Sequence, residues 1–175
     1  MVDYRRFRLP GGCYFFTVVT ADRTHGLLVE HIADLREAFR EVRARHPFEL
    51  EAIVVLPDHL HCIWSLPDGD DDFSTRWRQL KSAFTHRVPP GERRSASRLA
   101  KGERGVWQRR FWEHALRDEA DYRQHVDYIH YNPVKHGHVQ HVRNWPYSSF
   151  HRFVQRGIYP PQWAGEGMDR GLEWE

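Results

Sequence analysis

The chain has 175 residues, a length that favours one domain and suffices for a buried core without disulfides or structural metals. Two cysteines exclude a disulfide framework, and the absence of a long apolar run excludes a membrane span, so we expect a cytoplasmic protein without a targeting segment. The net charge is only +2, but residues 87–110 hold eight Lys or Arg against two Glu. This local charge of +6 leaves −4 for the rest, and it indicates either a solvated loop or a phosphate-binding segment.

The apolar residues follow strand and helix periodicities in alternation along most of the chain. In chain order they predict a strand at 13–20, a helix at 31–45, strands at 50–56 and 59–66, a helix at 73–88, a strand at 106–116 and a helix from about 118 to 131. Asp118 suits the N-cap of the last helix, and Pro133 predicts its end, which would leave Tyr128 near the C-terminal end. Residues 91–105 are rich in Arg, Ser and Gly and predict a mobile basic loop.

This order of elements, β-α-β-β-α-β with a further helix, predicts an α+β fold of the ferredoxin-like (RRM-like) type. Such a fold is an antiparallel sheet with helices on one face, and we expect the other face to stay free. The extra C-terminal helix would bear the tyrosine. We expect a single domain over residues 1–157 and a C-terminal tail at 158–175 that packs back on the domain or occupies a DNA groove.

Two histidines, His59 and His61, flank one apolar residue on a predicted strand. Side chains two apart on a strand point to the same face, so both imidazoles can reach one metal ion. Tyr128 and Asn132 are four apart on a predicted helix and can also approach one point together. An isolated His-x-His pair is more often an ordinary part of a strand, but the four residues together favour a site with a metal ion and a nucleophile.

The donor set of two imidazoles and one amide oxygen suits Mg²⁺ or Mn²⁺ better than Zn²⁺, since no Cys pair accompanies it. Such an ion would withdraw charge from a phosphodiester while the Tyr128 phenol attacks phosphorus. Tyr128 could instead be a core residue, and Tyr131 is a competing nucleophile that directly precedes Asn132. His125 and His130 are minor candidates for a proton shuttle or a phosphate contact.

Aromatic rings and arginines are interleaved in the segment 107–112, a composition suited to single-stranded bases and phosphates. In the alternative reading the rings fill the core and the arginines are solvated. A smaller patch of the same type lies near the N-terminus. The residues expected to contact DNA are Arg5, Arg6, Arg8, Trp107, Arg109, Arg110 and Lys135.

Five blocks of sequence, in this order, resemble the HUH single-tyrosine transposases, and within them the REP-associated tyrosine transposases of bacteria. The blocks lie at residues 5–17, 57–61, 107–114, 128–135 and 145–150. The resemblance implies that His59 and His61 are metal ligands, Tyr128 the nucleophile and Asn132 the third ligand. It also implies a bacterial, nucleoid-associated enzyme, monomeric or homodimeric. The enzyme would nick and rejoin single-stranded DNA at palindromic hairpins with short flanking sequence, through a 5′-phosphotyrosine intermediate.

The residues leave two other functions open. One is a module that binds structured nucleic acid, or represses a promoter, without cutting. The other is a metal-dependent hydrolase of small phosphoesters, which would leave the basic aromatic segment unused.

Overall fold

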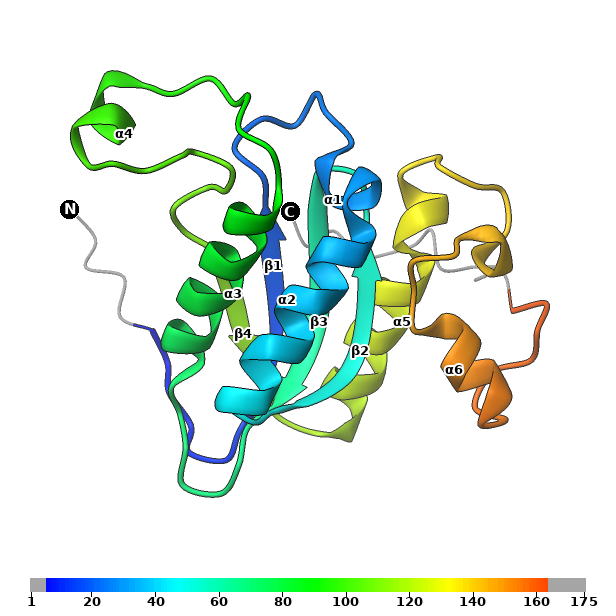
Figure 1. Cartoon of the computed structure of the whole chain (residues 1–175). Helices are drawn as coiled ribbons and strands as arrows, with labels where there is room; N and C mark the ends of the chain where they lie inside the picture. Colours follow the sequence, from blue (N-terminus) through cyan, green and yellow to red (C-terminus); the bar gives the residue numbers. More distant parts are fainter. Residues whose placement is uncertain (1–5, 164–175) are drawn as a thin grey trace.

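A four-stranded antiparallel sheet with helices on both faces forms the body of the computed structural model, which describes residues 6–163 (Figure 1). The strands lie in the order β2-β3-β1-β4. Their bounds are β1 Cys13–Val19, β2 Glu49–Val55, β3 His59–Ser65 and β4 Trp112–Ala115. The helices are α1 Leu27–Glu30, α2 Ile32–Arg45, α3 Phe73–Arg87, α4 Ala96–Ala100, α5 Glu119–Lys135 and α6 Phe150–Gln155, with a 3-10 turn, η1, at Val142–Asn144. The predicted ferredoxin-like arrangement is confirmed.

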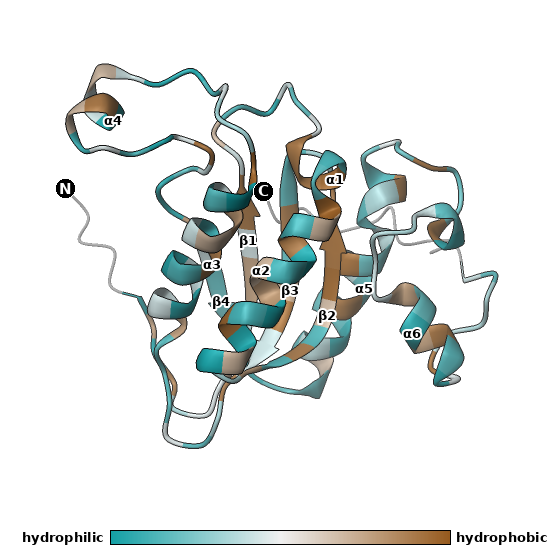
Figure 2. Ribbon diagram, viewed as in Figure 1, coloured by the Kyte–Doolittle hydropathy of each residue, from teal (hydrophilic) through white to brown (hydrophobic). Residues whose placement is uncertain are grey.

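The first core lies between the sheet and the helices α2 and α3, where apolar residues of the strands meet the apolar stripes of both helices (Figure 2). Trp64 of β3 stacks on Trp77 of α3, with ring centroids 4.2 Å apart, and both side chains are fully buried. In α3, four apolar residues at helical spacing are all buried: Phe73, Trp77, Leu80 and Phe84. The predicted helical periodicity is therefore confirmed.

The opposite face of the sheet is covered in part by α5, so the prediction that it stays free is wrong. Val126 and Ile129 of α5 pack against Phe15, Val54 and other strand residues in a second core. These strand residues alternate with those of the first core, because successive side chains point to opposite faces of a sheet. A sheet with two apolar faces requires a cover on each, and the tyrosine-bearing helix supplies the second.

The helix α5 also ends later than predicted, because it continues through Pro133 to Lys135. Proline removes only its own N–H from the helix, and the His136 N–H still donates to the Asn132 carbonyl at 3.0 Å. Gly137, with a φ of 71°, follows the last turn and ends it. Tyr128 therefore lies about two turns before the end of α5 and not at its tip.

Two further predictions differ in detail from the structure. The fourth strand, predicted at 106–116, is only four residues long. In the predicted part that precedes it, the segment 106–111 makes a single β-bridge, between Trp107 and Thr20. The side chains of Arg98 and Lys81 donate to the carbonyls of Trp107 and Gln108, which takes these groups out of the sheet. The predicted basic loop at 91–105 contains the helix α4, which Ser95 caps.

The β2 edge of the sheet is closed by the segment that precedes α6. The Val55 N–H donates to the Tyr147 carbonyl, and the Ser149 N–H donates to the Ile53 carbonyl, both at 2.8 Å. The Ser149 hydroxyl accepts from the Ile53 N–H at 2.9 Å and also bonds to His130 of α5 at 2.8 Å. Ser149 thus joins the sheet edge to the back of the tyrosine helix.

Two aromatic residues of the predicted tail, Tyr159 and Trp163, pack back on the domain. Tyr159 stacks on Phe153 of α6, with ring centroids 5.8 Å apart, and donates a hydrogen bond to Asp127 of α5. Residues 164–175 of the predicted tail lie outside the described residues. Among the helices of residues 6–163, none combines the length and the apolar character that crossing a bilayer requires.

We predict that Ser149→Ala lowers the free energy of unfolding by about 1 to 3 kcal/mol, because it leaves buried partners of the hydroxyl unsatisfied. Urea denaturation measures this change. Ser82→Ala is the control, since its hydroxyl is on the exposed side of α3, and we expect a change below about 0.5 kcal/mol. Equal effects of the two substitutions would contradict the assigned role of Ser149.

Candidate active site

His59 and His61 lie on β3 with their side chains on the face covered by α5, and both are buried. Asp58 accepts a hydrogen bond from Nδ1 of His59 at 2.7 Å, and Thr17 Oγ1 lies 2.8 Å from Nδ1 of His61. Partners on Nδ1 fix each ring and leave Nε2 for another ligand, the arrangement typical of metal-binding histidines. The two rings meet nearly at right angles with centroids 5.0 Å apart.

Tyr128 and Asn132 reach the same point from α5. The ring of Tyr128 lies 5.2 Å from that of His61, and both Tyr128 and Asn132 are buried. Asn132 faces His59, although neither atom of its amide makes a hydrogen bond of normal geometry within residues 6–163. The structure therefore brings together the four side chains that the sequence predicts to form one site.

The buried polar atoms at this point fit a divalent metal ion. Nε2 of His61 and Oδ1 of Asn132 have no hydrogen-bond partner in the described part of the chain. Leaving such atoms unpaired costs free energy, so their presence together indicates a ligand that both can bind. An imidazole nitrogen and an amide oxygen are both donors to divalent ions.

Burial also sets the protonation of the two imidazoles. Desolvation lowers the pKa of His59, although the hydrogen bond to Asp58 offsets part of the effect. Desolvation holds the pKa of His61 well below its usual value, and the neighbouring groups His59, His136 and Lys135 lower it further when they are protonated. Both rings are therefore neutral near pH 7, which is the form that binds a metal ion.

The last residue of α5, Lys135, and the residue that follows it, His136, also approach this site. The ammonium group of Lys135, predicted as a DNA contact, lies 5.0 Å from the centre of the Tyr128 ring. The ring of His136 lies 5.2 Å from that of His59, and sequence reasoning missed it. His136 follows Asn132 by four residues, a spacing that would have identified it, but the predicted end of the helix near residue 131 concealed this signal.

Of the two minor candidates, His125 lies about one turn before Tyr128 on the side of α5 that faces the sheet, whereas His130 lies on another side of the helix. His125 is buried between α5 and the sheet, and its ring packs 4.8 Å from that of Phe15. His130 is fully buried, bonds to Ser149 and packs edge-on to Phe153 at 4.7 Å.

The other predicted DNA contacts lie mainly on the α3 side of the sheet. Arg6 stacks on Phe111 at 3.9 Å, and Arg8 pairs with Asp71 at 3.3 Å. Arg109 pairs with Glu103. Arg110 is exposed, and Arg5 lies outside the described residues.

Trp107, by contrast, is buried, packs against Phe84 and donates from its indole N–H to the Lys81 carbonyl. Its ring is too enclosed to stack on a base, so the alternative reading of a core residue holds for Trp107.

A pocket of about 530 Å³ concentrates positive charge on this α3 side of the sheet. Arg6, Lys81, Arg98 and Arg109 line it. Burial, together with the charges of Arg6 and Arg98, lowers the pKa of Lys81 to about 8. Closely spaced cations of this kind attract an anion such as phosphate.

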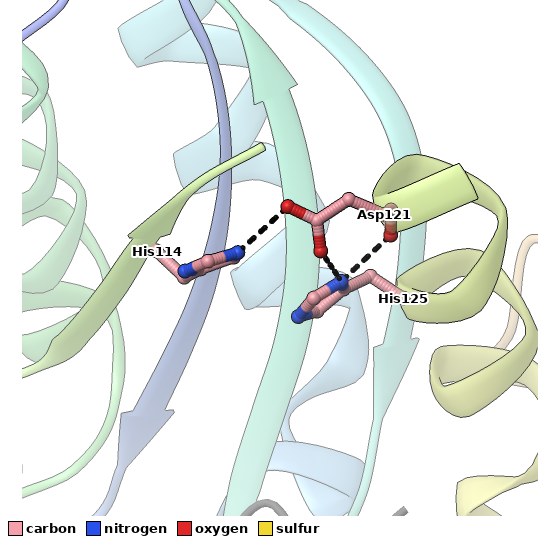
Figure 3. A group of neighbouring side chains, drawn as sticks. All are labelled: His114, Asp121 and His125. Carbon is pink, nitrogen blue, oxygen red and sulfur yellow. Dashed lines mark hydrogen bonds and ion pairs between the residues drawn. The ribbon is translucent and has the colours of Figure 1, made fainter. Parts of the chain in front are cut away.

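A second group of titratable side chains joins β4 to the start of α5 (Figure 3). Asp121 accepts hydrogen bonds from Nε2 of His114 at 2.9 Å and from the backbone N–H of Arg117 at 3.0 Å. Nδ1 of His125 lies 3.1 Å from the other carboxylate oxygen and 2.8 Å from the Asp121 carbonyl. His114, Asp121 and His125 are close enough to hold a metal ion, but these bonds already occupy the Asp121 carboxylate. We therefore regard the group as a link between strand and helix.

We predict that Asp121→Asn destabilises the protein at neutral pH but not in acid. Burial alone would raise the pKa of Asp121, but hydrogen bonds from His114 and Arg117 outweigh it and lower the pKa to about 2. Because the folded pKa lies below the unfolded value, the stabilisation is complete above about pH 4 and disappears as the pH falls towards 2. We expect a loss of about 2 to 3 kcal/mol at pH 7, measured by urea denaturation. A difference that stays constant from pH 7 to pH 3 would disprove the linkage.

A ferredoxin-like sheet whose paired histidines lie under a tyrosine-bearing helix defines the HUH class of transposase fold. Comparisons with known proteins identify the family. A REP-associated tyrosine transposase of Escherichia coli K12 is 52% identical over 169 residues, which cover 97% of this chain and 94% of the relative. A Haemophilus influenzae protein assigned to the same family is 48% identical over 166 residues, with 94% of each chain covered.

A solved structure leads to the same family. It is that of a REP-associated tyrosine transposase bound to a REP hairpin, with a TM-score of 0.83 and 52% identity, and the match covers 94% of this chain and 92% of that one. No family model matches the chain. On these similarities the chain belongs to the REP-associated tyrosine transposases.

Proposed function

We propose that this protein nicks and rejoins single-stranded DNA at palindromic, REP-type hairpins, with Tyr128 as the nucleophile. The proposal is supported chiefly by the approach of the Tyr128 ring to His61, at 5.2 Å, with Asn132 one helical turn further along. Membership of the family and the hairpin bound to the solved relative support the choice of DNA as substrate. The large share of both chains covered by these matches supports the same reaction for the whole of this chain.

In the first step the Tyr128 oxygen would form a bond to the scissile phosphorus, and the bond from phosphorus to the 3′ oxygen would break. The products are a 5′-phosphotyrosine and a DNA end whose 3′ oxygen takes up a proton, while the phenol proton passes to water. Rejoining is the reverse, with a 3′-hydroxyl as the nucleophile. One tyrosine permits one covalent link at a time.

The side chains around Tyr128 favour this step. A phenol is mostly protonated at neutral pH, so a nearby positive charge must stabilise the phenolate that attacks. Lys135, whose ammonium group lies over the Tyr128 ring, can supply that charge. His59, His61 and Asn132 would hold a divalent metal ion, for which we propose Mg²⁺ or Mn²⁺. When bound, such an ion withdraws charge from the phosphate and orients it for attack.

The proposal also covers the extent of the domain and the residues that contact DNA away from Tyr128. We propose a domain over residues 1–157 that acts in the bacterial nucleoid. Arg6, Arg8, Arg109 and Arg110 would contact the phosphates of the hairpin from the α3 side of the sheet. This division assigns binding and cleavage to different faces of the sheet.

We predict that Tyr128→Phe abolishes the covalent adduct but keeps hairpin binding within about threefold, because only the attacking oxygen is removed. The measurement is incubation with a labelled hairpin and Mn²⁺, followed by a denaturing gel that retains covalent adducts. Tyr131→Phe is the matched control, since it removes the neighbouring hydroxyl, and it should form the adduct. If wild type binds the hairpin tightly but gives no adduct with any divalent metal, the protein is a binding module and the proposal fails.

We predict that His61→Gln lowers the affinity for Mn²⁺ by at least about tenfold, because a ligand is lost from a small set. Isothermal titration with Mn²⁺ alone measures this, and EDTA should stop adduct formation by wild type. His138→Gln, on an exposed histidine after α5, is the control. Unchanged affinity in His61→Gln would remove His61 from the metal site.

A further inference from the structure

An exposed tryptophan lies at the edge of the sheet on the same face as the candidate active site. Trp112 is the first residue of β4, and its side chain is 43% exposed. The other tryptophans among residues 6–163 are buried or half-buried. Placing a large ring in water forgoes the free energy gained by burying it.

The strand register relates Trp112 to the histidine pair. Thr17 of β1 pairs with His61 of β3 on one side and with Trp112 of β4 on the other. Directly paired residues of antiparallel strands project from the same face, so these three form one row across the sheet. With neighbouring strands about 4.8 Å apart, the backbone of Trp112 lies about 10 Å from that of His61. A nucleotide next to a scissile phosphate bound at Tyr128 could therefore reach Trp112.

The ring of Trp112 is braced from within the protein. It lies nearly parallel to the ring of His114, with centroids 6.0 Å apart and 6° between the planes, and edge-on to Phe15 at 5.7 Å. His114 in turn stacks on His125 at 4.9 Å and donates to Asp121, as Figure 3 shows. The chain of contacts ends on α5, the helix that bears Tyr128, so the exposed ring and the nucleophile have a common support.

We infer that Trp112 is a stacking platform for a base in the single-stranded DNA that flanks the scissile phosphate. The inference rests on the proposed function for the nature of the ligand. A flat ring that is supported on one side and exposed to solvent is suited to stacking with an unpaired base, whose face is accessible only in single-stranded DNA. Stacking tolerates any base, so the platform would position the strand and leave the choice of sequence to other contacts.

The test measures binding, without divalent metal, of a hairpin with single-stranded flanks and of a series in which one flanking nucleotide at a time is abasic. We expect Trp112→Ala to weaken binding of the intact hairpin by about 5- to 100-fold. We also expect one or two abasic positions to weaken binding by wild type but to have little further effect on Trp112→Ala. This coupling between side chain and base is the signature of stacking.

The variants are chosen to separate stacking from folding. Trp112→Phe keeps a flat ring and should recover most of the affinity, whereas Trp112→Leu keeps apolar packing on Phe15 and should not. Leu99→Ala, which removes an exposed apolar side chain from α4, is the matched control and should bind as wild type does. Thermal unfolding of each variant shows that it is folded, and Trp112→Leu carries the test if Trp112→Ala does not fold.

Independent losses, in which Trp112→Ala and every abasic position multiply their effects, would overturn the inference. So would an equal loss with a hairpin that lacks single-stranded flanks. Because the measurement needs no cleavage, its outcome is separate from that of the adduct assay. If the coupling between Trp112 and a flanking base is found but wild type forms no covalent adduct, the stacking role of Trp112 stands and the nicking function is rejected.

Discussion

The packing of α5 on the β3 face of the sheet is the contact on which the site depends. It brings the Tyr128 ring to 5.2 Å from His61, although the two residues are far apart in the chain. Ile129 and its apolar neighbours hold the inner side of the helix in the second core, and the bond between His130 and Ser149 holds its outer side to the closed edge of the sheet. A helix fixed on both sides can keep the Tyr128 oxygen within the small tolerance that the proposed attack on phosphorus requires.

This packing removes the polar side chains of the site from water, which costs free energy but sets their protonation and leaves some of their atoms without hydrogen bonds among the described residues. Burial keeps the imidazoles of His59 and His61 neutral, and it leaves Nε2 of His61 and the amide of Asn132 without hydrogen bonds among the described residues. Unpaired buried polar groups destabilise a fold, so a site of this kind is maintained by the cores around it. A divalent ion would satisfy these atoms, and its binding would therefore also stabilise the folded state.

The sequence was sufficient to predict the parts of the site that depend on a single element. His59 and His61 share a face because they are two apart on a strand, and Tyr128 shares a face with Asn132 because they are four apart on a helix. The sequence could not predict features that depend on tertiary packing. Proline at 133 is a local signal for a helix end, but packing and the remaining hydrogen bonds carry α5 on to Lys135, which hid His136. Trp107, which was expected to contact DNA, is buried while Trp112 is exposed, because exposure depends on where β4 begins to pair.

The two faces of the sheet also constrain the path of DNA. The pocket lined by Arg6, Lys81 and Arg109 opens on the α3 side, whereas Tyr128 lies on the other. A strand that reaches both has to pass around one edge of the sheet. Hydrogen bonds from the segment at 147–149 cover the β2 edge, so the path that the proposed function requires would lead around the edge formed by β4. Trp112 lies on that edge, in the row of His61, where a strand turning from the basic pocket towards Tyr128 would meet its ring.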